Sequence, residues 1–174
     1  MPDRYALFGN PLGHSKSPLI HNGFAKVTGE DVEYGLIEAP LDGFAKAALA
    51  FRDSGAKGCN ITAPFKLDAY ALATDKMERA QQAGAVNCLK FEPDGRILAE
   101  MFDGIGLAND VETNLGVSMK GKRVLLLGAG HCFRDQVVAA CPSCVGPPAA
   151  EGGLQKAVEG SSIETIKHMV ASGM

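Results

Sequence analysis

Strand-like and helix-like segments alternate along this chain, and the alternation constrains its fold more than any other feature of the sequence. Short apolar or alternating runs typical of strands occur at 5–9, 32–37, 58–63 and 86–91. A turn at 93–95 then leads into a run at 96–100, which predicts a hairpin. This order predicts an α/β layer structure with a mixed sheet and helices on both faces.

Helical patterns fill the segments between the strands. Ser17 and Pro18 predict a helix start, with a capping hydroxyl and a proline at the first position, and Gly29 predicts its end. Further helical patterns, of which the second reads as one helix or a pair, lie at 41–54, 67–83 and 103–115.

Composition narrows the class of protein. Hydrophobic residues make up 46% of the 174 residues and charged residues 21%, which is typical of a soluble globular protein. The formal charge of −3 argues against a nucleic-acid partner, which favours a basic surface. No apolar run reaches the length of a membrane span, so we expect a cytoplasmic protein without a membrane partner.

A short polar stretch, Gly58–Lys66, contains the third strand pattern and the turn after it. Asn60 and Thr62 share one face of a strand because side chains repeat every second residue. Pro64 cannot donate a ladder hydrogen bond and predicts a turn, after which Lys66 opens the next helix. Each residue alone is most simply an exposed polar residue, but together they suggest a site.

A glycine-rich turn occurs later, after an apolar run at 123–127 that is typical of a buried parallel strand. Gly128, Ala129 and Gly130 match the first half of the dinucleotide-binding pattern G-x-G-x-x-G, whose backbone amides hold a pyrophosphate at a helix N-terminus. Phe133 stands where the third glycine would be, so the signal is weak by itself.

Several separate motifs, in the right order, resemble the shikimate dehydrogenase family. They lie at 8–18, 58–66, 83–87 and 103–107, so the resemblance covers roughly the first 130 residues. It implies a substrate-binding domain at 1–118, followed at 119–130 by the first strand and glycine turn of a Rossmann-like domain. It also implies NADP as cofactor, held in part by the Gly128–Gly130 turn, and shikimate or 3-dehydroshikimate as substrate.

The resemblance assigns roles to individual side chains. Ser15 and Ser17 would bind the substrate carboxylate, the ring hydroxyls would contact Asn60, Thr62 and Asn87, and the catalytic pair would be Lys66 and Asp103. A lysine beside a carboxylate can pass the hydroxyl proton while the cofactor handles the hydride. Other roles stay open: Ser17 and Asp103 can each cap a helix, and Asn87 can bond its own backbone.

The sequence also departs from the family. Met101 and Phe102 replace an Asn-Thr pair, and the resemblance stops after Gly130. A family member would also be longer than this chain by about a hundred residues, which supply the rest of the cofactor domain. We therefore expect a truncated or replaced cofactor domain and a poor catalyst, with a binding-only shikimate or quinate protein as an alternative. An unfinished sheet edge would favour association, so a homodimer is a further expectation.

The segment 131–174 resembles a different family, the regulatory domain of the LysR-type peroxide sensor OxyR. The residues that carry this resemblance lie at 130–136 and 160–173, and it implies a chimera of two protein pieces. It makes Cys132 the peroxide-reactive cysteine and Cys141 its disulfide partner, which gives a thiol-redox module as an alternative function. Inert cysteines are the simpler interpretation. A zinc site using the C-x-x-C at 141–144 has little support, so no metal is expected.

Overall fold

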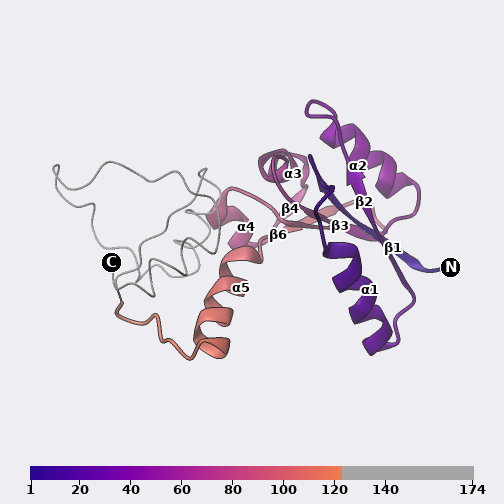
Figure 1. Cartoon of the computed structure of the whole chain (residues 1–174). Helices are drawn as coiled ribbons and strands as arrows, with labels where there is room; N and C mark the ends of the chain where they lie inside the picture. The colour runs from indigo at the N-terminus through magenta and orange to yellow at the C-terminus, as the bar shows by residue number, and fades with distance from the viewer. Residues whose placement is uncertain (123–174) are drawn as a thin grey trace. The chain divides into compact units, whose positions relative to one another are not determined.

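The computed structural model describes residues 1–122 of the chain, and these belong to two compact units that divide between Phe102 and Asp103. Figure 1 shows these residues coloured by residue number. The predicted domain limits of 1–118, 119–130 and 131–174 remain predictions, and the third segment lies outside the described residues.

The first unit is built on a six-stranded sheet with the strand order β2-β1-β3-β5-β6-β4. The strands are β1 (Asp3–Gly9), β2 (Val32–Glu38), β3 (Gly58–Ile61), β4 (Asp75–Lys76), β5 (Cys88–Phe91) and β6 (Ile97–Glu100). The pairs β1–β2, β1–β3 and β4–β6 are parallel, whereas β3–β5 and β5–β6 are antiparallel. The prediction of a mixed sheet is confirmed.

Helices lie on both faces of this sheet, as predicted. In Figure 1, α1 (Ser17–Thr28) covers one face, and α2 (Phe44–Asp53) and α3 (Lys66–Leu72) lie on the other. Phe8, Phe44 and Phe65 are almost fully buried between the sheet and these two helices, α2 and α3. The Phe44 ring packs against the Phe8 ring at a centroid distance of 5.8 Å and against the Phe65 ring at 5.2 Å. This aromatic layer fixes the start of α3 against β1.

The start of α1 differs from the prediction. Lys16 occupies the N-cap position without a side-chain cap, and Ser17 is the first helical residue, so the predicted capping hydroxyl of Ser17 is wrong. The Ser17 backbone amide instead donates to the Ser15 hydroxyl at 3.2 Å. The predicted end at Gly29 is confirmed, because Gly29 adopts the left-handed conformation at φ 75°.

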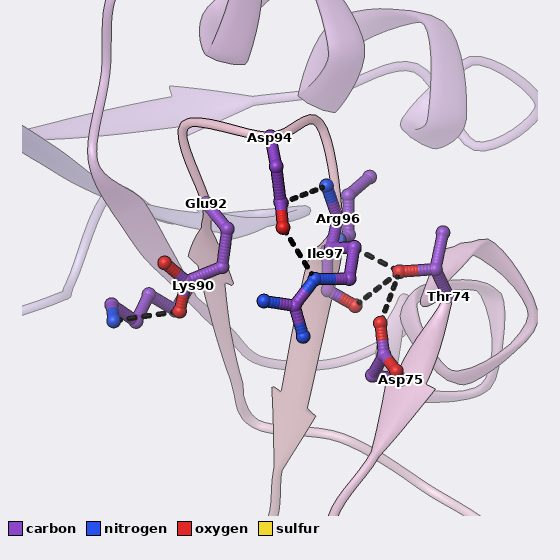
Figure 2. Close-up of polar contacts among 7 residues, drawn as sticks. All are labelled: Thr74, Asp75, Lys90, Glu92, Asp94, Arg96 and Ile97. Atoms are coloured by element: carbon purple, nitrogen blue, oxygen red, sulfur yellow. Dashed lines mark hydrogen bonds and ion pairs between the residues drawn. The ribbon is translucent and has the colours of Figure 1, made fainter.

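The segment 67–83 contains an element that the pattern did not predict. It forms a helix pair, α3 and α4 (Glu78–Ala83), with the two-residue strand β4 between them. Thr74 holds β4 beside β6, because its hydroxyl oxygen accepts from the Ile97 amide at 2.8 Å and donates to Asp75 at 2.9 Å, as Figure 2 shows. So short a strand has no periodicity to detect, and tertiary pairing creates it.

The predicted hairpin between β5 and β6 is confirmed. Its turn is closed by the Glu92 amide, which donates to the Arg96 carbonyl at 2.9 Å, and by an exposed ion pair between Asp94 and Arg96 at 2.7 Å (Figure 2). The Arg96 hydrogen bonds hold the pKa of Asp94 below its ordinary value.

The second unit begins with α5 (Asp103–Asn109), which continues as a π-helical segment, Asp110–Asn114. The single helix predicted at 103–115 is thus correct in extent, but its last turn widens. Among residues 1–122, no helix is both long and apolar enough to span a membrane.

Candidate functional site

The strand register brings two polar segments together at the carboxyl ends of the central strands β1 and β3. Because β1 and β3 run in parallel with Leu7 opposite Asn60, the segments that follow them leave the sheet on the same side. The Thr62 amide donates to the Phe8 carbonyl at 2.9 Å, and the Asn10 amide donates to the Ala63 carbonyl at 3.2 Å. The loop carrying Ser15 and Ser17 therefore starts directly beside the turn carrying Thr62.

Glycine makes this close approach achievable. A Cβ on Gly9 would lie 2.5 Å from Thr62 Cγ2 and 2.6 Å from Leu12 Cδ2, which no real packing allows. Leu12 is 4% exposed, so it has little freedom to move away. The absence of a side chain at Gly9 lets the Thr62 turn and the first loop pack against each other.

The loop from Asn10 to Ser17 is anchored to the end of β2. The Asn10 side-chain amide donates to the Ala39 carbonyl at 2.9 Å, and the Leu12 backbone amide donates to the Glu38 carboxylate at 3.0 Å. Ser15 and Ser17 follow at the N-terminus of α1, and both are partly exposed. Hydroxyls beside the first amides of a twelve-residue helix suit a carboxylate, because the helix dipole favours negative charge there.

Lys66 and Asn87 come together from distant parts of the chain. Lys66 is the first residue of α3, and its backbone carbonyl accepts a hydrogen bond from the Val86 amide at 3.1 Å. Asn87 is the residue after Val86, and its backbone carbonyl accepts a hydrogen bond from the Ile61 amide at 2.9 Å. Asn87 Oδ1 also accepts from the Phe102 amide at 2.9 Å, which fixes the orientation of its side-chain amide. Both predicted site residues are partly exposed.

Asn60 has a partner that sequence reasoning missed. The Tyr34 hydroxyl on β2 reaches across β1 and donates to Asn60 Oδ1 at 2.8 Å. Asn60 Nδ2 donates in turn to the backbone carbonyl of Asn87 at 3.4 Å, so the Asn60 side chain is connected to the backbone of the second predicted ligand-binding residue. The alternation of β2 placed Tyr34 on one face of its strand, but only the register of three strands brings it to Asn60.

The structure therefore gathers Ser15, Ser17, Asn60, Thr62, Lys66 and Asn87 within the first unit. Asp103 is the first residue of α5 in the second unit, and its pairing with Lys66 remains a prediction. Such an arrangement can bind a small carboxylate that carries several hydroxyls, because it combines short donors and acceptors with an amine.

The other predicted sites lie outside the described residues. This holds for Gly128, Ala129 and Gly130, predicted to bind NADP, and for Cys132 and Cys141, the predicted redox pair. Within residues 1–122, Cys59 and Cys88 are free thiols, and no cluster of side chains suited to a metal ion occurs. Burial raises the pKa of both thiols, so neither is an activated nucleophile.

Comparison with known proteins shows that most of the first unit is similar to one described domain family. Residues 7–89 match the family described as "Shikimate dehydrogenase substrate binding domain". The match runs from β1 into β5 and includes each of the site residues of the first unit named above.

Similar whole proteins extend further along the chain. The shikimate dehydrogenase (NADP(+)) of Nitrosospira multiformis is 54% identical over 137 residues, which is 79% of this chain and 50% of that protein. Among solved structures, an Ael1 enzyme from Pseudomonas putida is 55% identical, with a TM-score of 0.74, over 81% of this chain and 52% of its own. The chain spans about half the length of the curated relatives it matches.

A further solved structure contains bound ligands. Shikimate 5-dehydrogenase from Thermus thermophilus, in complex with NADP(H) and shikimate, is 29% identical, with a TM-score of 0.72, over 80% of this chain and 52% of its own. The fold of the first unit is therefore that of a shikimate dehydrogenase substrate-binding domain.

Proposed function

We propose that this chain binds shikimate and 3-dehydroshikimate and acts as a weak NADP-dependent shikimate dehydrogenase. The observation that carries the proposal is the set of backbone hydrogen bonds that hold Thr62, Lys66 and Asn87 at the ends of the central strands, next to the loop of Ser15, within the residues that match the substrate-binding domain. Relatives named as NADP(+) shikimate dehydrogenases and a neighbour bound to shikimate support it.

The residues suit the chemistry of this substrate. Ser15, Ser17 and the first turn of α1 bind the carboxylate, and the amide and hydroxyl side chains of Asn60, Thr62 and Asn87 bind ring hydroxyls. In the oxidation of shikimate, Lys66 with Asp103 takes the proton of the reacting hydroxyl, and in the reverse direction returns it to the ketone oxygen. NADP supplies the hydride acceptor or donor for the same carbon.

Binding without effective turnover is a second candidate. It is favoured by the sequence after the predicted cofactor turn, where Phe133 replaces the third glycine of the dinucleotide pattern. The two candidates share the substrate site and differ in NADPH oxidation. In the purified chain supplied with 3-dehydroshikimate, steady NADPH oxidation supports the dehydrogenase, whereas shikimate binding without oxidation supports the binding protein.

Calorimetric titration with shikimate tests the substrate site that both candidates need. The wild-type chain should give a saturable heat, and Lys66→Ala should weaken binding by about tenfold, because a charged hydrogen-bond donor to the ligand is lost. Lys46→Ala, an exposed lysine on α2, is the matched control and should leave affinity unchanged. If titration of the wild-type chain with shikimate gives no heat of binding, the proposal is refuted.

A further inference from the structure

A buried tyrosine stands behind the predicted ligand contacts. Tyr34 is 6% exposed and packs in a core cluster with Leu7 and Leu12. The ring of His21 on α1 stacks on the Tyr34 ring at a centroid distance of 4.1 Å, with an angle of 4° between the planes. These contacts leave the phenol ring one position, so its hydroxyl is held in a fixed place.

The fixed hydroxyl determines which way the Asn60 amide faces. Tyr34 donates to Asn60 Oδ1 at 2.8 Å, while Asn60 Nδ2 lies 3.4 Å from the Asn87 carbonyl and donates to it. Reversing the amide would place the Asn60 oxygen against the Asn87 carbonyl oxygen, and two acceptors repel each other. The amide therefore has one favourable orientation.

This orientation leaves Asn60 a defined hydrogen-bonding capacity. A side-chain amide has two N–H donors and two oxygen lone pairs. Its contacts within residues 1–122 use one donor and one lone pair, so one of each remains at a partly exposed position. A ligand hydroxyl that contacts Asn60 is therefore offered one N–H donor and one oxygen acceptor, each at a fixed position.

We propose that Tyr34 is a positioning residue, which orients the Asn60 amide so that the site selects a ring hydroxyl at this point of the substrate. The proposal rests on the proposed function, because it takes Asn60 as a substrate contact. Tyr34 itself touches no ligand and acts through Asn60. Burial raises the pKa of the Tyr34 phenol, so the hydroxyl keeps the proton that it donates.

Tyr34→Phe isolates this role from packing. The substitution keeps the ring that fills the cluster and stacks on His21, and removes only the oxygen that meets Asn60. Tyr5→Phe is the matched control: Tyr5 lies on the adjacent strand, directly opposite Tyr34 in the register, and packs against the same cluster.

A double-mutant cycle with shikimate calorimetry tests the coupling. Tyr34→Phe should weaken binding about fivefold to tenfold, since loss of one hydrogen bond that orients a ligand contact costs about this much. In the Asn60→Ala background, the same substitution should change affinity less than about twofold, because no amide is left to orient. Tyr5→Phe should stay within about twofold in both backgrounds. An unchanged affinity in Tyr34→Phe, or an equal loss in both backgrounds, overturns the proposal.

A ligand-free measurement separates this inference from the proposed function. In ¹H–¹⁵N NMR spectra, Tyr34→Phe should shift and broaden the Asn60 side-chain amide signals, whereas Tyr5→Phe should leave them in place. If the wild-type chain gives no heat with shikimate, the proposed function fails, and the Asn60 signals then decide the orienting role alone. Unchanged Asn60 signals in Tyr34→Phe would overturn that role even if shikimate binds.

Discussion

The backbone amide of Leu12 donates a hydrogen bond to the carboxylate of Glu38 at 3.0 Å. This contact ties the loop that precedes α1 to the end of β2, and the loop carries Ser15 and Ser17. A charge-assisted hydrogen bond to a backbone amide fixes the loop at one point of its length. Glu38 thus connects the edge strand of the sheet to the proposed carboxylate-binding segment.

Glu38→Ala should therefore weaken shikimate binding more than it weakens the fold. We expect an affinity loss of about threefold to tenfold, because the loop would sample other positions, and a change in the free energy of unfolding below about 1 kcal/mol. Calorimetry and urea unfolding measure the two effects. Glu33→Ala, at an exposed position on the same strand, is the control, and equal affinities in the two variants would contradict the anchoring role.

Gly58 is expected to be essential for the pairing of β3 with β5. A Cβ at this position would lie 2.6 Å from the backbone oxygen of Leu89, and a paired strand cannot move aside without losing hydrogen bonds. Gly58→Ala should lower the free energy of unfolding by about 1–3 kcal/mol in urea titrations. Gly35→Ala on edge strand β2 has no atom within 4 Å of its new Cβ and should cost far less. Similar losses in the two variants would refute the steric argument.

Stability should decline at alkaline pH because of Cys59. Burial, and secondarily the nearby Cys88, raises the pKa of the Cys59 thiol above 9.0, its ordinary value. The folded state therefore favours the neutral thiol, so its contribution is fully present below pH 9.0 and is lost as pH rises toward the folded pKa. The free energy of unfolding should stay level from about pH 7 to 8 and fall above about pH 9.

The variant Cys59→Ala separates this effect from general alkaline destabilisation. Its alkaline decline should be shallower than that of the wild type, although not absent, because the pKa of Cys88 is also raised. Urea unfolding measured at intervals from about pH 7 to 10 gives both slopes. Identical slopes in the two proteins would show that Cys59 is not the group responsible.

The sequence was a good guide to the elements, whereas the choice of site residues stays a prediction. Alternating and helical patterns located β1, β2, α2 and the β5–β6 hairpin, because each has enough residues to show a period. The resemblance singled out Asn60, Thr62, Lys66 and Asn87, and the structure brings them together at the carboxyl ends of β1 and β3.

Features that depend on tertiary contacts escaped prediction. The strand β4 exists through Thr74 and its pairing with β6, and Ser17 lies inside α1 because the loop before it is anchored elsewhere. Exposure on α1 could not be predicted either: Ile20, Phe24 and Val27 recur at helical spacing, yet their side chains are 48%, 61% and 87% exposed, because helical spacing does not determine what a helix face packs against. Tyr34 was missed because its partner lies two strands away.

The central claim is that shikimate binds at the edge of the first unit where the segments after β1 and β3 meet the start of α3. Backbone ¹H–¹⁵N NMR spectra of the chain, recorded during titration with shikimate, test this claim residue by residue. The account predicts that the largest shifts fall on Ser15, Ser17, Thr62, Lys66 and Asn87, while exposed positions on α2 such as Lys46 stay unchanged. Shifts confined to other residues, or none at saturating shikimate, would contradict it.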